Sequence, residues 1–157
     1  MLKIHKVGEP VLTIHRQTFR TDTLVYIGVA NKELSYKFSK KSPIVYIGTT
    51  KNGVQRIAQS AAYHASNILG EYGIHTLNFY HVTCKPKKGL KTWKKLERAL
   101  IITFREIFGE VPYCNKQGKN MDWHNERTIF NVNSLRDIIQ KYSNKNRGNV
   151  KCKLKSV

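Results

Sequence analysis

The tetrapeptide Val-Tyr-Ile-Gly, at residues 25–28 and again at residues 45–48, decides the fold of this chain. Each copy lies in a short run of β-branched and aromatic residues, which predicts one strand over residues 23–30 and a second over residues 43–50. The polar residues 31–42 form a connection that is longer than a hairpin needs, and a long inserted loop is often functional. We therefore expect an elaborated antiparallel hairpin.

Apolar periodicity predicts further elements on both sides of this hairpin. Spacings of three and four predict a helix after the Asn52-Gly53 turn, and a longer helix with Thr92 as its N-cap that stops at Gly109. The expected elements are a strand at 11–19, a helix at 54–69, a strand at 75–84, a helix at 92–108, a loop at 109–125, a short strand at 126–131, a helix at 133–142 and a basic tail at 144–157.

Length and composition indicate a single domain. The chain has 157 residues, of which 40% are hydrophobic, enough for one core. No stretch approaches the ~18 apolar residues of a membrane span, and residues 1–6 lack the apolar run of a signal peptide. Three scattered cysteines without a C-x-x-C pair argue against a disulfide framework or a zinc module. We expect an intracellular, cytoplasmic protein in reducing surroundings, with no membrane partner.

The charge indicates a polyanionic partner. Lysine and arginine number 28 against 10 acidic residues, which gives a net charge of +18 and a pI near 10.0. Such a field concentrates nucleic acid at the surface, although a merely soluble basic protein is the simpler alternative. The residues expected to contact DNA are basic or aromatic and lie in the inserted loop, in a basic turn and in the tail: Lys32, Tyr36, Lys37, Phe38, Lys40, Lys41, Lys87, Lys88, Lys145, Arg147, Lys151, Lys153 and Lys155.

One carboxylate falls on the apolar stripe of the second long helix. Glu97 follows Trp93 by four residues and precedes Leu100 by three, so it shares their face. A carboxylate among apolar neighbours is costly unless it is compensated, and a divalent metal ion is one such compensation. The alternative is that Glu97 lies at the edge of the stripe and pairs with Lys94 or Arg98 in solvent.

The two tyrosines of the repeated motif occupy equivalent positions. If the two strands pair, Tyr26 and Tyr46 point to one side, and Gly28 and Gly48 leave room there for a phosphate or a backbone. A phenol at its ordinary pKa is a poor base, but it becomes useful beside cations or as a donor that orients water. The alternative is that both are ordinary strand aromatics, which are common.

Other polar residues are candidates for binding a phosphate. A guanidinium such as that of Arg56 holds two phosphate oxygens at once and stabilises developing charge. The Asn115 amide either braces its loop or contacts the phosphate. Ser60, His64 and Lys51 are auxiliary candidates, although His64 lies two turns beyond Arg56 and its side chain is expected to be hard to bring into reach. The remaining histidines have no metal-ligand spacing, which disfavours zinc.

In this order, the residues resemble the GIY-YIG nuclease family. The first motif reads LVY at 24–26, with the family's glycine replaced, and the second is intact as YIG at 46–48. Arg56 follows that glycine by eight residues, LERAL at 96–100 supplies the glutamate, and PYCN at 112–115 supplies the asparagine. Two departures are a longer gap between the first two motifs and Ser60, which stands where several relatives have histidine.

The resemblance covers about residues 23–118 and implies an α/β (α+β) fold, with a small central, mostly antiparallel three-stranded sheet flanked by helices. Residues 1–22 are then an N-terminal extension and residues 119–157 a C-terminal helix and basic tail. It also implies one Mg²⁺ or Mn²⁺ ion held by Glu97. The implied catalytic residues are Tyr26 to activate or position water, Arg56 to stabilise the phosphorane, and Tyr46 and Asn115 to orient the phosphate.

The activity implied is that of a metal-dependent DNA endonuclease that leaves 5′-phosphate and 3′-hydroxyl ends. The competing class is a non-catalytic nucleic-acid-binding module on the same fold, such as an RNA-binding or ribosome-associated protein. Within the family, elimination by length and by the lack of cysteine-rich modules leaves a compact stand-alone nuclease, with a restriction type as one option. The DNA target, the biological role and the oligomeric state stay open at this point.

Overall fold

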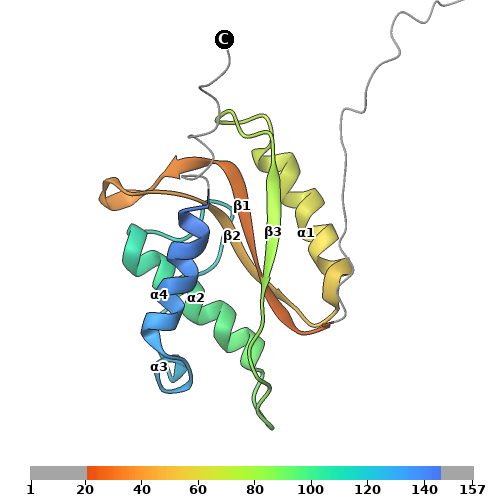
Figure 1. The fold of residues 1–157 in the computed structure, drawn as a ribbon, viewed down its shortest axis with the longest axis vertical. Helices are drawn as coiled ribbons and strands as arrows, with labels where there is room; N and C mark the ends of the chain where they lie inside the picture. Colours follow the sequence, from red (N-terminus) through yellow and green to blue (C-terminus); the bar gives the residue numbers. More distant parts are fainter. Residues whose placement is uncertain (1–20, 146–157) are drawn as a thin grey trace, which may run out of the picture.

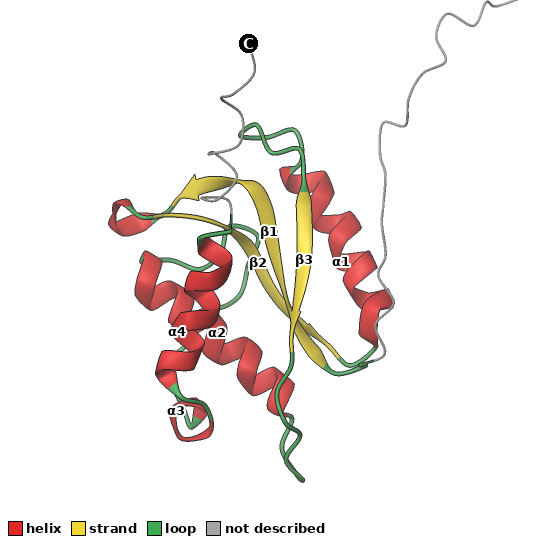
Figure 2. Ribbon diagram, viewed as in Figure 1, coloured by secondary structure: helices red, strands yellow, loops and turns green. Residues whose placement is uncertain are grey.

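The computed structural model describes residues 21–145 and arranges them as a three-stranded sheet with helices on both sides (Figures 1 and 2). The elements are β1 (Leu24–Ser35), the 3₁₀ turn η1 (Lys37–Ser39), β2 (Lys41–Thr50), α1 (Gly53–Ile68), β3 (Leu77–Val82), α2 (Thr92–Phe108), α3 (Glu126–Ile129) and α4 (Val132–Ser143). The strand expected at 11–19 and most of the basic tail lie outside the described residues.

The sheet confirms the expected α+β class with an antiparallel three-stranded sheet. Its strand order is β2-β1-β3, so the two motif strands are neighbours and β2 forms an edge. The register places Tyr26 opposite Gly48 and Gly28 opposite Tyr46, so each tyrosine faces the glycine of the other motif. A register shift follows Gly28, where Val29 pairs with Ile44 and leaves Val45 as the extra residue of a bulge.

The expectation of a long polar loop between the motif strands is wrong. Strand β1 continues to Ser35 and β2 begins at Lys41, so only the tight turn around η1 separates them. The extension is held by buried residues within the polar segment. Leu34 and Tyr36 are 8% and 7% exposed, and the Tyr36 ring packs edge-on against Phe104 of α2 at 5.1 Å between centroids.

Helix α1 lies on one side of the sheet, and α2 and α4 lie on the other (Figure 1). Burial of apolar side chains holds α2 and α4 against the sheet, because the sheet residues Val25, Ile27 and Val29 belong to one hydrophobic cluster with residues of these two helices. The helical residues of this cluster include Leu96, Leu100, Phe104, Leu135 and Ile139. The packed core therefore extends past residue 118 and includes α4.

Helix α2 has the bounds expected from its apolar spacing, with one difference at its start. Lys91 takes the N-cap position, and Thr92 is the first helical residue. The helix ends at Gly109, whose φ of 81° is in the left-handed region that favours glycine. A Cβ there would also come within 2.7 Å of the Lys37 Cβ, so this glycine lets the β1–β2 turn approach the helix end.

The segment after α2 differs from the expected short strand. Residues 126–129 form one helical turn, α3, because the Glu126 side chain is fully buried and tied to α2. Its Oε1 lies 3.2 Å from the Lys95 Nζ and 3.1 Å from the Arg98 Nε, and its Oε2 accepts from the backbone N–H of His124. Such a buried carboxylate is tolerated only because it is paired.

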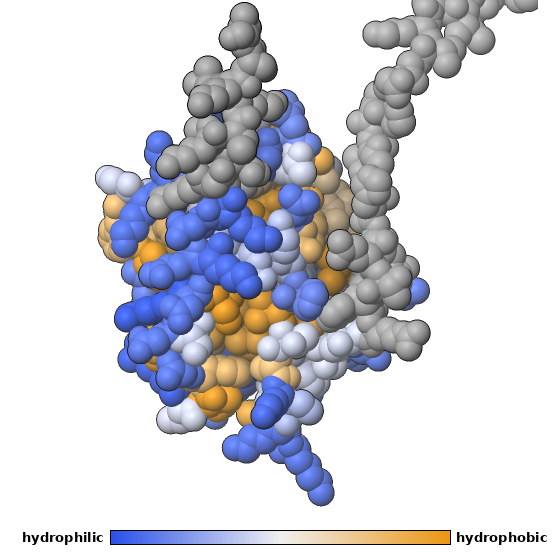
Figure 3. Space-filling model, viewed as in Figure 1, coloured by the Kyte–Doolittle hydropathy of each residue, from blue (hydrophilic) through white to orange (hydrophobic). Residues whose placement is uncertain are grey.

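None of the helices within residues 21–145 is long and apolar enough to cross a membrane. Hydrophilic side chains cover much of the α4 side of the molecule in Figure 3.

Candidate active site

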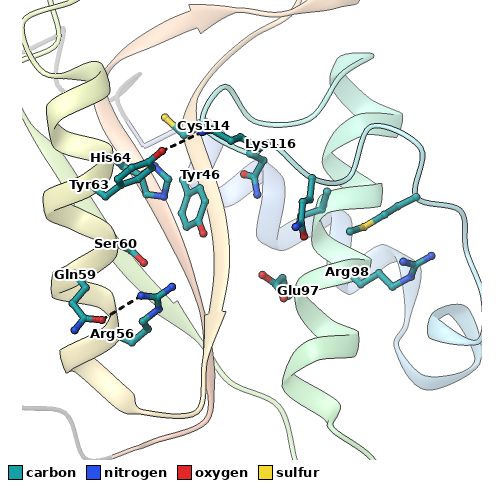
Figure 4. Close-up of a pocket in the computed structure, with 14 residues that line it drawn as sticks. Tyr46, Arg56, Gln59, Ser60, Tyr63, His64, Glu97, Arg98, Cys114 and Lys116 are labelled. Atoms are coloured by element: carbon teal, nitrogen blue, oxygen red, sulfur yellow. Dashed lines mark hydrogen bonds between the residues drawn. The ribbon is translucent and has the colours of Figure 1, made fainter.

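A cavity of about 570 Å³ opens at the edge strand β2, between α1 and α2 (Figure 4). It is bounded by side chains from both helices, from β2 and from the loop that follows α2. These are Tyr46, Arg56, Gln59, Ser60, Tyr63, His64, Glu97, Arg98, Ile101, Cys114, Asn115, Lys116, Gln117 and Met121. Six of the residues selected from the sequence thus surround one cavity: Tyr46, Arg56, Ser60, His64, Glu97 and Asn115.

The two motif tyrosines do point to one side, and their rings fill the room that the glycines leave. The Tyr26 and Tyr46 ring centroids are 5.7 Å apart. A Cβ on Gly48 would lie 2.5 Å from Tyr46 Cε1 and 2.9 Å from Tyr26 Cζ. A Cβ on Gly28 would lie 3.2 Å from a Phe79 ring carbon. The glycines accommodate aromatic rings, so the expected space for a phosphate beside them is absent.

Tyr26 lies behind the cavity rather than in its wall. Its side chain is only 2% exposed, and its hydroxyl is hydrogen-bonded to the Ser60 Oγ at 2.7 Å. This position does not suit a group that activates water, which is the role the family resemblance implies for Tyr26. Tyr46 is the motif phenol that lines the cavity.

The rings of Tyr46 and His64 are in contact on the α1 side of the cavity, tilted by 38°. Their ring centroids are 3.9 Å apart, so His64 is within reach of the site, contrary to the expectation from its helix position. Burial, together with the neighbouring Tyr26, raises the pKa of Tyr46, which keeps the phenol neutral. Burial and the nearby Lys116 lower the pKa of His64, which keeps the imidazole neutral at pH 7.

Glu97 faces the cavity from α2, across from Tyr46 and Arg56 (Figure 4). Among residues 21–145 its carboxylate has no hydrogen-bond or ion-pair partner, whereas Arg98 pairs with Glu126. Burial raises the pKa of Glu97 from 4.5 to about 7, and only the charge of Lys94 opposes this. Among residues 21–145 neither Lys94 nor Arg98 forms an ion pair with Glu97, so the alternative of a solvent pair is wrong, and the charge of Lys94 offsets the burial only in part.

This carboxylate fits a hard divalent cation. A half-buried, unpaired carboxylate beside an open cavity gains most when a cation neutralises it. Within the described part of the chain no group of three or more His, Cys, Asp or Glu side chains could hold a metal. An ion at Glu97 would therefore take most of its other oxygens from water and substrate.

Arg56 is exposed at the mouth of the cavity, one turn into α1. Its Nη1 donates to the Gln59 Oε1 at 3.2 Å, and no acidic side chain within residues 21–145 pairs with it. Figure 4 shows its guanidinium directed toward the region between Tyr46 and Glu97. Lys51, the other cation suggested near this turn, is exposed and does not line the cavity.

Asn115 holds the loop after α2 against the free edge of β2. Its Oδ1 accepts from the Ile47 N–H at 2.9 Å, and its Nδ2 donates to the Ile47 carbonyl at 2.8 Å. The Cys114 N–H adds a bond to the carbonyl of the bulged Val45. Of the two roles considered for the amide, this geometry fits bracing, and it also covers the edge strand.

The residues expected to contact DNA fall into three groups. Lys37, Phe38, Lys40, Lys41, Lys87 and Lys88 are exposed, and Lys32 is exposed while its Nζ donates to the Tyr72 carbonyl. The expectation for Tyr36 is wrong, because its ring is buried and its hydroxyl donates to the Ile44 carbonyl. Lys145 lies over the Tyr80 ring at 3.5 Å, and Arg147, Lys151, Lys153 and Lys155 lie outside the described residues.

Two structural features were not predicted from the sequence. Tyr63 and Lys116 line the cavity and are bonded at 3.1 Å between Nζ and OH, although 53 residues separate them. Glu126 anchors α3 to α2 from a segment with little apolar pattern. The weak sequence signal for the first pair was the position of Lys116 directly after Asn115.

Searches against protein-family models, curated proteins and solved structures give no match to this chain.

Proposed function

We propose that this protein is a metal-dependent endonuclease that hydrolyses phosphodiester bonds in DNA and leaves 5′-phosphate and 3′-hydroxyl ends. The observation that supports this most is the meeting of Tyr46, Arg56 and Glu97, from three different elements, around one cavity. Each of these residue types suits one part of phosphoryl chemistry: a donor, a bidentate cation and a metal ligand.

In this proposal each side chain has a separate role toward a phosphate bound in the cavity. Water attacks phosphorus and the bond from phosphorus to the 3′ oxygen breaks, so the 3′ oxygen must gain a proton. Arg56 binds two phosphoryl oxygens and stabilises their developing charge. The neutral phenol of Tyr46 donates to a phosphoryl oxygen, and the neutral imidazole of His64 accepts a proton from the attacking water. A solvent water supplies the proton that the leaving 3′ oxygen gains.

Glu97 would hold the Mg²⁺ or Mn²⁺ ion. The bound ion would polarise a phosphoryl oxygen as a Lewis acid and offset the charge of the substrate. In this scheme Tyr26, Ser60 and Asn115 position other groups and take no direct part in the reaction. The Tyr26 ring packs against the Tyr46 ring and is held by its hydrogen bond to Ser60, and Asn115 fixes the loop that lines the cavity.

The test is incubation of the purified protein with supercoiled plasmid in Mg²⁺, in Mn²⁺ and in EDTA. We expect nicked and linear products with either metal and none in EDTA. The products should be substrates for a ligase, because it requires 5′-phosphate and 3′-hydroxyl ends. Tight plasmid binding without cleavage under all conditions would contradict the proposal and favour the non-catalytic binding module.

A further inference from the structure

An exposed aromatic surface adjoins the cavity. Tyr63, Tyr72 and Tyr113 are 54%, 54% and 51% exposed, although large aromatic side chains are usually more buried. Two lysines, Lys32 and Lys116, contact them. We call these five residues the tyrosine surface.

Contacts hold the tyrosine surface in place without covering it. The Tyr72 and Tyr113 hydroxyls are hydrogen-bonded at 2.8 Å, and their rings meet edge-on with centroids 5.6 Å apart. This bond to Tyr72 raises the pKa of Tyr113 to about 12, so the hydroxyl stays neutral. The Lys32 Nζ donates to the Tyr72 carbonyl at 2.9 Å. Rings fixed in this way lose little freedom when a ligand stacks on them.

The tyrosine surface shares part of its residues with the site. Tyr63 and Lys116 line the cavity themselves, and the Lys116 Nζ donates to the Tyr63 hydroxyl (Figure 4). Tyr113 directly precedes Cys114, which also lines the cavity. A chain whose phosphate lies beside Arg56 would therefore pass over Tyr63, which lines the same cavity.

We propose that the tyrosine surface binds unstacked bases of single-stranded DNA next to the phosphodiester that is cleaved. Aromatic rings stack with any base that is free of a duplex, and neighbouring lysines pair with the phosphates between the bases. Bases inside a duplex are already stacked, so duplex DNA gains little from these rings. The position beside the scissile bond depends on the proposed nuclease function, whereas the preference for single strands does not.

The test is equilibrium binding of full-length protein to a thymidine oligonucleotide and to a duplex of equal length, both in EDTA so that no cleavage occurs. The triple variant Tyr63→Ala/Tyr72→Ala/Tyr113→Ala should bind the single strand roughly tenfold or more weakly, since each stacked base contributes several-fold or more. Its affinity for the duplex should be nearly unchanged. The matched control replaces the same three residues with phenylalanine, which keeps the rings and should keep most of the affinity.

The salt dependence of oligonucleotide affinity distinguishes base stacking from contacts between lysines and phosphates. The alanine variant should lose affinity at every salt concentration without a change in salt slope. Lys116→Ala should instead lower the slope for the single strand by about 0.7, the contribution of one phosphate contact. If the triple variant does not fold, Tyr63→Ala and Tyr113→Ala made singly carry the test, because both side chains are more than half exposed.

Equal losses on single strand and duplex, or no loss on either, would overturn this proposal. It would also be wrong if the alanine variant removed self-association of the protein and left oligonucleotide binding intact, because the surface would then join two copies of the chain. If the protein does not cleave DNA but the alanine variant loses affinity for the single strand alone, only the nuclease function is contradicted. If the protein cleaves DNA but the alanine variant shows no such selective loss, only the base-binding surface is contradicted.

Discussion

The protonation of Glu97 links the candidate metal site to pH. Burial raises its pKa from 4.5 to about 7, so the folded protein holds a proton here that the unfolded chain releases at lower pH. The stability that this group contributes is fully present below about pH 4.5 and is lost as pH rises through about 7. Above that pH the metal-free protein contains an uncompensated carboxylate.

Replacing Glu97 with glutamine should therefore stabilise the metal-free protein in a pH-dependent way. We expect Glu97→Gln to raise the melting temperature at about pH 8 and to change it little at about pH 4, as measured by thermal unfolding in EDTA. Mg²⁺ should raise the melting temperature of the wild-type protein and leave that of the variant unchanged. Equal responses of the two proteins to Mg²⁺ would contradict the metal site at Glu97.

Metal binding itself should depend on pH for the same reason. A proton and a cation compete for the Glu97 carboxylate, so the apparent Mg²⁺ affinity should fall about tenfold per pH unit below pH 7 and level off above it. A titration of Mg²⁺ binding between about pH 5 and pH 9 measures this. An affinity that did not change over this range would show that the ion binds elsewhere.

The two motif phenols should differ in their effects. Tyr46→Phe removes the hydroxyl from the cavity wall and should slow cleavage by about 10²-fold, the scale of one positioned donor. Tyr26→Phe removes only a buried bond to Ser60, so it should lower stability by roughly 1 kcal/mol and affect the rate less. Single-turnover rates and unfolding free energies separate the two. A larger rate loss for Tyr26→Phe would restore the original assignment of Tyr26 as the group that activates water.

Gly48 is the residue on which the paired phenols depend most. An added Cβ would lie 2.5 Å from Tyr46 Cε1 and 2.8 Å from its hydroxyl oxygen, so Gly48→Ala should cost about 1–3 kcal/mol and displace Tyr46. Gly28→Ala is the matched control, since its nearest contact would be 3.2 Å, and it should cost less. Denaturant unfolding compares them. A Gly48→Ala variant as stable and as active as the wild type would contradict this packing.

At the scale of elements, the loop after α2 and the turn α3 are held by a few polar groups. Glu126 is fully buried, yet its pKa is lowered, because the hydrogen bonds from the His124 N–H and Lys95 outweigh the effect of burial. A lowered carboxylate pKa contributes stability that is present above about pH 4.5 and is lost as pH falls through the lowered value.

Glu126→Gln should accordingly destabilise the protein near neutral pH, by roughly 1–3 kcal/mol, because Lys95 and Arg98 lose their shared anion. The loss should shrink in acid, where the wild-type carboxylate also becomes protonated. Glu106→Gln is a matched control on α2, since Glu106 pairs with Arg127 near the surface and should cost less. Equal losses for both variants would contradict the anchoring role.

The sequence predicted those elements whose pattern is local and apolar. The spacing of Leu96, Leu100 and Phe104 gave α2 its bounds, and the repeated motif gave the antiparallel pair β1 and β2. It failed where tertiary contacts override local polarity. Tyr36 extends the hairpin because its ring packs against Phe104. Glu126 forms a helical turn because its carboxylate pairs with cations on α2.

The candidate site follows the same division. The residues of the site could be recognised from the sequence, but how deeply each side chain is buried and what it contacts could not. Only packing decides that Tyr26 lies behind Tyr46, that the His64 ring contacts the Tyr46 ring, and that the Asn115 amide is hydrogen-bonded to the Ile47 backbone. These facts depend on the β1–β2 register and on the path of a loop that has no periodicity.

At the scale of the whole molecule, the net charge of +18 should set affinity without setting the chemical step. Removal of residues 146–157 deletes four basic side chains: Arg147, Lys151, Lys153 and Lys155. We expect weaker DNA binding and a salt slope that is lower by up to about 3–4 units, since each phosphate contact contributes about 0.9 on duplex DNA. The single-turnover rate at saturating enzyme should be unchanged. A lost chemical step with intact binding would make the tail part of the active fold.

The most direct test of the nuclease account is single-turnover cleavage of end-labelled DNA in Mg²⁺ by the wild type, Glu97→Gln and Glu106→Gln. The two glutamates lie on the same helix, but only Glu97 faces the cavity. We predict cleavage by the wild type and by Glu106→Gln at similar rates, and none by Glu97→Gln, which should still bind the DNA at least as tightly because it lacks a negative charge beside the phosphate. Cleavage by Glu97→Gln at more than a few per cent of the wild-type rate would contradict the account.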